Sequence, residues 1–116
     1  MAVGLIRRGD ILLVNFTPAR EGEANYTRPA VVVTNNQFNA QGMAVTVIPL
    51  TTNLERVYSF QVLLPNNRTG LHEDSKAQVE QVRSVAISRT IRRLGHVPED
   101  LMAQIDERLK LHLALD

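Results

Sequence analysis

Apolar residues along this chain fall into short runs, and only the C-terminal part repeats them at helical spacing. The runs are rich in aliphatic and β-branched residues, and several stop at proline or asparagine. Short apolar runs bounded by turn residues predict β-strands. The expected strands cover residues 10–16, 29–34, 43–48, 58–64, 75–85 and 91–97.

Three details refine this strand prediction. Three consecutive valines in the second run, Val31 to Val33, suit a strand that is buried on both faces. Pro49 is expected to end the third strand, because proline interrupts a strand ladder. The alternation in residues 75–85 slips at Gln81 and Val82, which predicts a β-bulge there.

The C-terminal part predicts one helix over residues 98–114. Pro98 suits the first helical position, and the carboxylates of Glu99 and Asp100 suit the positive end of the helix dipole. Its apolar stripe consists of Leu101, Met102, Ile105, Leu109 and either His112 or Leu113. Short strands followed by one helix predict a mainly β fold, a small barrel with the helix packed on it or facing a partner subunit.

Composition limits the class of protein. At 116 residues, with 44% hydrophobic and 22% charged residues, the chain is expected to form a single globular domain over residues 1–116. The absence of cysteine excludes a disulfide scaffold and a thiolate nucleophile, and three scattered histidines argue against a zinc enzyme. No apolar run approaches the about 20 residues of a membrane span, and residues 1–10 lack the pattern of a signal peptide. A cytoplasmic protein is therefore expected.

The charge is nearly balanced overall but unevenly distributed. A net charge of +1 argues against attraction of nucleic acid by the whole protein. No acidic residue lies between Glu80 and Glu99, however, and that stretch contains Arg83, Arg89, Arg92 and Arg93. The stretch could face phosphates or simply be solvated, and the sequence leaves both interpretations open.

Candidate chemistry lies at strand ends. Residues 17–27 form a long polar connection, which is a common place for functional groups. Arg28 directly precedes the buried valine strand, where a cation needs an anionic partner, either Glu21 or Glu23 or a bound anion. Thr51 and Thr52 could hold a phosphate oxygen or could simply cap the strand end.

Taken in order, several segments resemble the MazF/PemK family of toxin endoribonucleases, and the resemblance covers nearly the whole chain. The matching segments are Arg8-Gly9-Asp10-Ile11, Gly22-Glu23, Arg28-Pro29-Ala30-Val31-Val32-Val33 with Asn35, Ile48-Pro49-Leu50-Thr51-Thr52, Glu80-Gln81-Val82-Arg83-Ser84-Val85, Arg89, and Leu94-Gly95. The C-terminal helix completes the pattern.

This resemblance implies a fold and a chemistry. The fold is a closed SH3-like β-barrel of the CcdB/MazF/PemK type with a C-terminal helix, and the protein is a homodimer. The activity is sequence-specific cleavage of single-stranded RNA without a metal or other cofactor. The RNA's own 2′-hydroxyl attacks the phosphodiester and leaves a 2′,3′-cyclic phosphate and a 5′-hydroxyl, so the protein supplies charge stabilisation and proton transfer.

The resemblance also assigns catalytic roles. Arg28 stabilises the charged phosphorane and takes part in proton transfer. Thr51 holds a non-bridging oxygen, and Glu23 is a candidate base or orients Arg28. Because arginine stays protonated in proteins, its electrostatic role is favoured over proton transfer.

RNA recognition is expected on the same face. Phe16 could stack a base or could belong to the core, and Gln81 has a donor and an acceptor for a base edge. The complete set of expected RNA-binding residues is Phe16, Asn35, Thr52, Gln81, Arg83 and Arg89.

Partners and alternatives complete the hypothesis. The expected regulator is a MazE-like antitoxin with an acidic flexible tail, and DNA contact is expected only through the toxin–antitoxin complex. One alternative is a non-catalytic toxin of the CcdB type that binds DNA gyrase, which would not need Arg28 and Thr51 as a pair. Another is a peptide-docking SH3-like module. Such a module binds peptides in an aromatic groove, and a chain with 4% aromatic residues and no tryptophan has few residues to form one.

Overall fold

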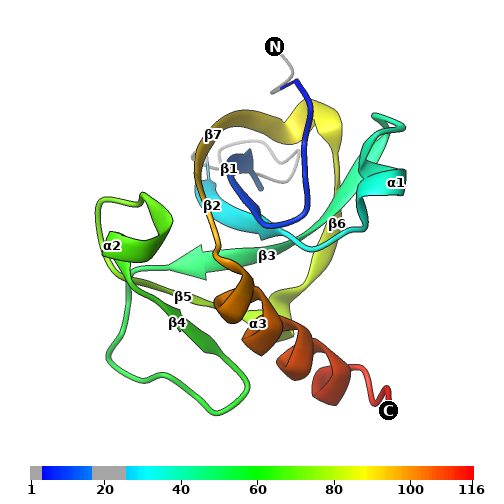
Figure 1. Ribbon diagram of the computed structural model, residues 1–116. Helices are drawn as coiled ribbons and strands as arrows, with labels where there is room; N and C mark the ends of the chain where they lie inside the picture. Colours follow the sequence, from blue (N-terminus) through cyan, green and yellow to red (C-terminus); the bar gives the residue numbers. More distant parts are fainter. Residues whose placement is uncertain (1–3, 17–25) are drawn as a thin grey trace.

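The computed structural model describes residues 4–16 and 26–116. Figure 1 shows a curled antiparallel sheet with one long helix against it. The strands are β1 (Asp10–Asn15), β2 (Thr27–Val32), β3 (Ala44–Thr51), β4 (Val62–Leu64), β5 (Ser75–Ala77), β6 (Arg83–Ala86) and β7 (Thr90–His96). The helices are α1 (Asn36–Asn39), α2 (Asn66–Thr69) and α3 (Glu99–His112), with 3₁₀ turns η1 (Val79–Gln81) and η2 (Ile87–Arg89).

The strands form one seven-stranded sheet. Its order is β4-β5-β3-β2-β1-β7, and β6 pairs with β3 outside this path. All of these pairings are antiparallel. Within the described residues neither β4 nor β6 pairs with β7, so the ladders do not close and the expectation of a closed barrel is wrong in that respect. The mainly β fold with a C-terminal helix is confirmed.

Strand β3 organises the sheet because it changes partner along its length. On one edge it pairs with β6 up to Val47 and with β5 from Leu50 onward. Pro49 lies in the gap between these two ladders, where its missing N–H costs no ladder hydrogen bond on that edge. The strand therefore continues through Pro49 to Thr51, and the predicted end at Pro49 is wrong.

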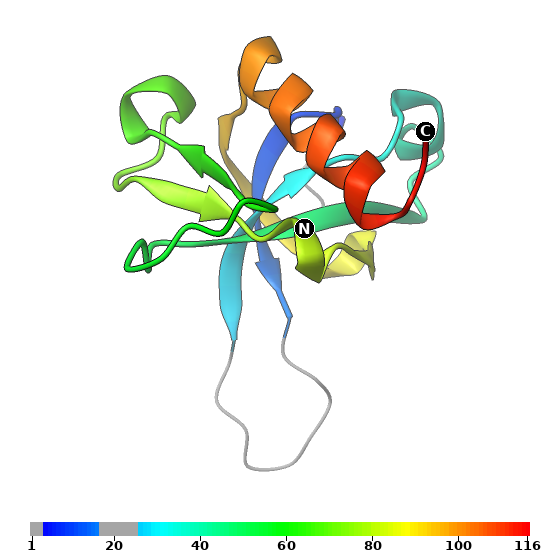
Figure 2. The ribbon, with the colours of Figure 1, turned by 90° about the horizontal axis from the view of Figure 1, so that it is seen from below.

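Apolar side chains pack on both faces of the sheet. One cluster joins alternate residues of the strands, such as Val31 and Ile48, to Leu101 and Ile105 of α3. The other, which includes Val32 of β2 and Leu12 and Val14 of β1, lies on the opposite face. Figure 2 shows α3 lying across the sheet. The prediction that the valine strand is buried on both faces is confirmed by Val31 and Val32, which are both fully buried.

Two predicted strands are shorter than the pattern indicated. In residues 58–64 only Val62–Leu64 is a strand, because the backbone N–H of Tyr58 donates to Oε1 of Gln61 at 3.1 Å and closes a turn. The predicted bulge in residues 75–85 is instead η1, in which the N–H of Gln81 donates to the carbonyl of Gln78 at 2.8 Å.

Helix α3 matches its prediction closely but uses only part of the predicted stripe. It begins at Glu99, with Pro98 just before it, and ends at His112. Leu101, Met102 and Ile105 are buried, whereas Leu113 is 51% exposed. No helix in the described ranges is long and apolar enough to cross a bilayer.

Gly95 allows α2 to approach β7 closely. A Cβ placed on Gly95 would lie 2.0 Å from the backbone carbonyl oxygen of Thr69, the last residue of α2. Gly70 then ends α2 with a left-handed φ of 84°, which glycine adopts without strain. The segment after α2 is therefore held against the sheet beside Leu94.

Candidate active site

Arg28 lies in a hollow at the end of the sheet where β1 and β2 separate from η1. The hollow has a volume of about 280 Å³. Its lining side chains are Phe16, Tyr26, Arg28, Pro49, Gln78, Gln81 and Arg83. No Asp or Glu of residues 4–16 and 26–116 is among them, so the described lining of the hollow is cationic.

The local strand geometry places Arg28 there. Arg28 pairs with Val14 of β1, and it shares a sheet face with Ala30 and Val32 because side chains alternate along a strand. The β2–β3 ladder extends only to the pair Ala30–Pro49. Beyond that pair the two strands diverge, which leaves space for a long half-buried side chain.

Two neighbours orient the guanidinium of Arg28. Its Nη1 donates to Oε1 of Gln78 at 3.0 Å. Its Cζ lies 4.7 Å from the ring centroid of Tyr26, within the range of a cation–π contact. Gln78 thus holds one edge of the planar guanidinium, and the Tyr26 ring covers one of its faces. The remaining N–H groups of Arg28 can donate to an oxyanion in the hollow.

A second arginine stands beside the first. Cζ of Arg83 lies 5.2 Å from the ring centroid of Phe16. The rings of Phe16 and Tyr26 are 6.4 Å apart and inclined at 53°. Phe16 is only 6% exposed and belongs to the core, so the structure places it under the hollow rather than on its surface. Tyr26, by contrast, is 46% exposed.

The predicted RNA-binding residues Gln81, Arg83 and Arg89 come together on this side of the molecule. Gln81 and Arg83 line the hollow of Arg28. Arg83 and Arg89 also line a hollow next to it, with Asn15. Nη1 of Arg89 donates to the carbonyl of Asn15 at 3.4 Å.

Thr51 and Thr52 lie on different sides of the sheet edge. Side chains alternate along β3, so Thr51 lies on the same face as Val47 and Pro49. Pro49 pairs with Ala30 of β2, and Thr51 and Arg28 each lie two residues beyond this pair on their own strands. Thr51 and Arg28 therefore share one face of the sheet. Oγ1 of Thr51 accepts from the backbone N–H of Asn53 at 3.2 Å. Thr52 instead lines a different hollow on the other face.

Two residues that the sequence analysis assigned to the site are not among the described residues at this hollow. Asn35 follows β2 at the end opposite to Arg28, and its Oδ1 accepts from the N–H of Phe38 at 2.8 Å and caps α1. Glu23 lies outside the described residues, as does Glu21, the other proposed partner of Arg28.

The basic stretch between Glu80 and Glu99 does not form one surface. Arg83 and Arg89 face the hollows described above. Arg93 is bound elsewhere, because its Nη2 donates to Oδ2 of Asp10 at 3.0 Å. Arg92 lines the hollow that contains Thr52. The idea of a single phosphate-facing patch is therefore wrong for Arg93.

Sequence reasoning missed Gln78 and Tyr26. Gln78 precedes η1, and its backbone N–H donates to the carbonyl of Pro49 at 3.0 Å, which fixes its side chain beside Arg28. A polar residue between the buried Ala77 and Val79 was the available signal. In the described ranges, no three His, Asp or Glu side chains are placed to hold a metal ion.

Residues 7–113 match the family described as the PemK-like, MazF-like toxin of type II toxin-antitoxin systems. The chain belongs to this family, which confirms the resemblance seen in the sequence.

Individual relatives support the same assignment. The chain is 50% identical to endoribonuclease MazF9 of Mycobacterium tuberculosis, over 96% of this chain and 98% of the relative. It is 26% identical to endoribonuclease EndoA of Bacillus subtilis, over 96% and 97%. The MazE–MazF crystal structure (Form-II) from Deinococcus radiodurans matches with a TM-score of 0.83 and 25% identity, over 97% of this chain and 98% of that one. These matches do not favour the gyrase-binding alternative.

Proposed function

We propose that this chain, an endoribonuclease toxin of the PemK/MazF family, cuts single-stranded RNA by using the RNA's own 2′-hydroxyl as the nucleophile. The observation that supports this most directly is the orientation of Arg28 by Gln78 and Tyr26 in a cationic hollow. A fixed guanidinium beside a second cation, Arg83, suits a phosphodiester whose negative charge grows in the transition state.

The reaction needs no nucleophile from the protein. The 2′-oxygen forms a bond to phosphorus as its proton leaves, and the bond from phosphorus to the 5′-oxygen breaks as that oxygen gains a proton. The products are a 2′,3′-cyclic phosphate and a 5′-hydroxyl. Arg28 binds the non-bridging oxygens of the phosphorane and stabilises the negative charge that they carry.

The other catalytic positions remain part of the proposal. Thr51, on the face of Arg28, donates a hydrogen bond from its hydroxyl to a non-bridging oxygen, because its bond with the N–H of Asn53 uses the hydroxyl oxygen only as an acceptor. Glu23 is proposed as the base or as a group that orients Arg28. Neither assignment requires a metal ion, so the reaction should proceed in a chelator.

Recognition of single-stranded RNA uses the surrounding side chains. Gln81 is exposed at the hollow and can pair with a base edge through its amide. The exposed ring of Tyr26, supported from the core by Phe16, is a stacking surface for a base. Arg83 and Arg89 contact phosphates. Thr52 and Asn35 lie outside this hollow, so any contact that they make with RNA is elsewhere on the surface.

Assembly and regulation follow the family. We propose that the toxin is a homodimer and that a MazE-like antitoxin neutralises it, as the Deinococcus radiodurans MazE–MazF structure pairs those two proteins. Exposed apolar side chains at the end of α3, such as Leu111, support a contact with a second copy. Because the substrate is mRNA, the toxin is expected to act in the cytoplasm.

The test is cleavage of a long single-stranded RNA by purified protein in EDTA. We expect sequence-restricted cuts that end in a cyclic phosphate, identified by mass spectrometry. Arg28→Ala should lower the rate at least about a hundredfold, a barrier increase of about 2.7 kcal/mol. Thr51→Ala should also lower it, and exposed Gln37→Ala should not. Intact RNA with the wild-type protein would refute the proposal.

A further inference from the structure

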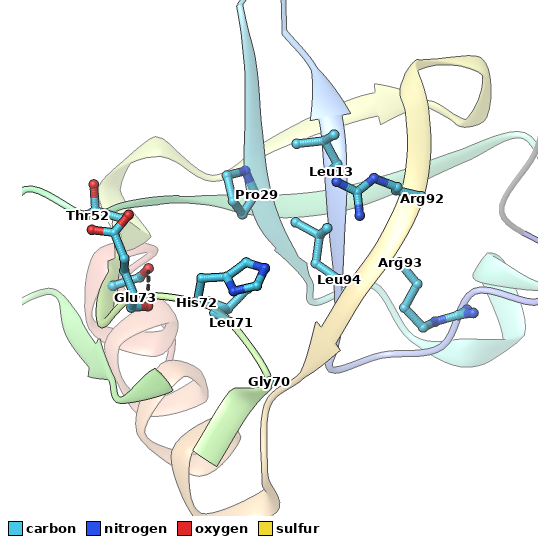
Figure 3. A pocket seen from close by; sticks show the side chains of 11 residues that line it. Leu13, Pro29, Thr52, Gly70, Leu71, His72, Glu73, Arg92, Arg93 and Leu94 are labelled. Atoms are coloured by element: carbon cyan, nitrogen blue, oxygen red, sulfur yellow. Dashed lines mark hydrogen bonds between the residues drawn. The ribbon is translucent and has the colours of Figure 1, made fainter. Parts of the chain in front are cut away.

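A second hollow lies on the opposite face of the strands that carry Arg28. It has a volume of about 300 Å³. Leu13 of β1 pairs with Pro29 of β2 on one side and with Arg92 of β7 on the other. Paired residues present their side chains on one face, so these three form a row across three strands, which Figure 3 shows along one side of the hollow.

The opposite wall is the segment that follows α2. The close contact of Gly95 with Thr69 holds this segment against β7. It contributes Leu71, His72 and Glu73 to the lining, and Thr52 adds a hydroxyl. Figure 3 shows the His72 ring extending across the hollow toward Leu94, with Glu73 and Thr52 at the other side.

Polar groups at this hollow are available for a ligand. Within residues 4–16 and 26–116, neither the guanidinium of Arg92 nor the imidazole of His72 takes part in a hydrogen bond or an ion pair. Both side chains are exposed. Arg93 also lines the hollow, but its side chain extends away from it and its guanidinium is bound to Asp10.

The second hollow is next to the candidate active site because consecutive residues of the chain line the two hollows. Pro29 directly follows Arg28, and Thr52 directly follows Thr51. Consecutive residues of a strand face opposite sides, so the two hollows share the same edge of β2 and β3. An extended strand of RNA that crosses this edge would reach both.

We infer that this second hollow binds the nucleotide that flanks the cleaved bond. This inference rests on the proposed function. The apolar side chains of Leu13, Pro29 and Leu94 suit the flat face of a base, and His72 can stack on it. Arg92 binds the adjoining phosphate, and the Glu73 carboxylate accepts from an amino group of the base edge.

The experiment measures both binding and base preference. First, cut sites of the wild-type protein are mapped on a long RNA. Then an oligonucleotide with that site, made uncleavable by 2′-deoxyribose at the cut, is titrated at several salt concentrations. Arg92→Ala should weaken its binding about tenfold and lower the slope of log affinity against log salt by about 0.7, the effect of one lost phosphate contact on a single strand.

Base preference provides an independent readout. With RNA randomised around the cut, His72→Ala and Glu73→Gln should lose preference at one flanking position and keep it at the position next to Arg28. Lys110→Ala, which removes an exposed charge from α3, is the control and should change neither the salt slope nor the preference. Thermal unfolding confirms that each variant is folded.

The outcomes separate this inference from the proposed function. If the wild-type protein neither cuts nor binds RNA, the proposed function fails and the inference fails with it. If it cuts RNA but Arg92→Ala and His72→Ala leave the salt slope and every base preference unchanged, only the second subsite is wrong.

Discussion

Gln78 fixes the guanidinium of Arg28 from 50 positions away in the sequence, by accepting a hydrogen bond from Nη1 at 3.0 Å. The backbone N–H of Gln78 is itself bonded to the carbonyl of Pro49. Strand β3 therefore positions the residue that orients Arg28. This connection holds the side chain of Arg28, near the start of β2, in the position that the proposed catalysis requires.

Removing the Gln78 amide should slow catalysis more than it weakens binding. In Gln78→Ala the hydrogen bond to the charged guanidinium is lost, which is worth about 1.5 kcal/mol and corresponds to a kcat about tenfold lower. The backbone bond to Pro49 remains, so stability should change little. Steady-state kinetics on a fluorescent RNA measures kcat and KM. Gln37→Ala, on exposed α1, is the matched control, and an equal kcat for both variants would contradict the positioning role.

Gly95→Ala should destabilise the fold by about 3 kcal/mol, because an added Cβ would collide with the rigid carbonyl of Thr69. The expected readout is the midpoint of urea unfolding. Gly42→Ala is the control: it has a φ of +72° but nothing within 4 Å of the added Cβ, so it should cost only about 1 kcal/mol of backbone strain. Equal losses of stability would show that the contact of α2 with β7 is unimportant.

The ion pair between Arg68 and Asp100 should make the free energy of unfolding depend on pH in the acidic range. Arg68 donates two hydrogen bonds to the Asp100 carboxylate, which lowers the pKa of that carboxyl below its ordinary value. A lowered folded-state pKa stabilises the protein above the ordinary aspartate pKa, and this stabilisation disappears as pH falls through the folded value.

Unfolding measured across acid pH tests this coupling. Asp100→Asn should be less stable than the wild type at neutral pH and equally stable in strong acid. Glu99→Gln removes the same charge from the same helical turn, so it separates the Arg68 contact from the helix dipole. A constant difference between Asp100→Asn and the wild type at every pH would contradict the role of this pair.

Leu111→Glu should separate the proposed homodimer without unfolding the protomer. Leu111 is 73% exposed, so a charge there should change the stability of a single chain by no more than about 0.5 kcal/mol. Phe60 and Leu111 line one apolar surface at the end of α3. Sedimentation equilibrium should show a dimer for the wild type and for the exposed control Gln104→Glu, and a monomer for Leu111→Glu. A monomeric wild type would refute the proposed assembly.

The sequence predicted those parts of the fold that depend on local patterning. The valines of β2 and the apolar stripe of α3 identify their elements because burial on one or both faces leaves a regular spacing. Residues whose conformation depends on distant contacts were not predicted. Pro49 continues a strand because β3 changes partner there, and η1 replaces a bulge because its turn packs against that strand.

The site shows the same division. Arg28 stands out in the sequence because a cation before a buried strand requires a partner. Of its neighbours in the described residues, Tyr26 is two positions away in the sequence, whereas Gln78 is 50 positions away and becomes adjacent only after folding. Thr51 and Thr52 look like a pair in the sequence, yet alternation at the strand end sends them to opposite faces.

In the proposed mechanism the substrate provides the nucleophile while Arg28 stabilises the charge of the phosphorane. The most direct measurement uses an RNA oligonucleotide with a mapped cut site and a single 2′-deoxyribose on the 5′ side of that bond. We expect this oligonucleotide to bind as tightly as unmodified RNA but not to be cut. Cleavage at the unmodified rate would show that the nucleophile is not the 2′-hydroxyl and would overturn the proposed mechanism.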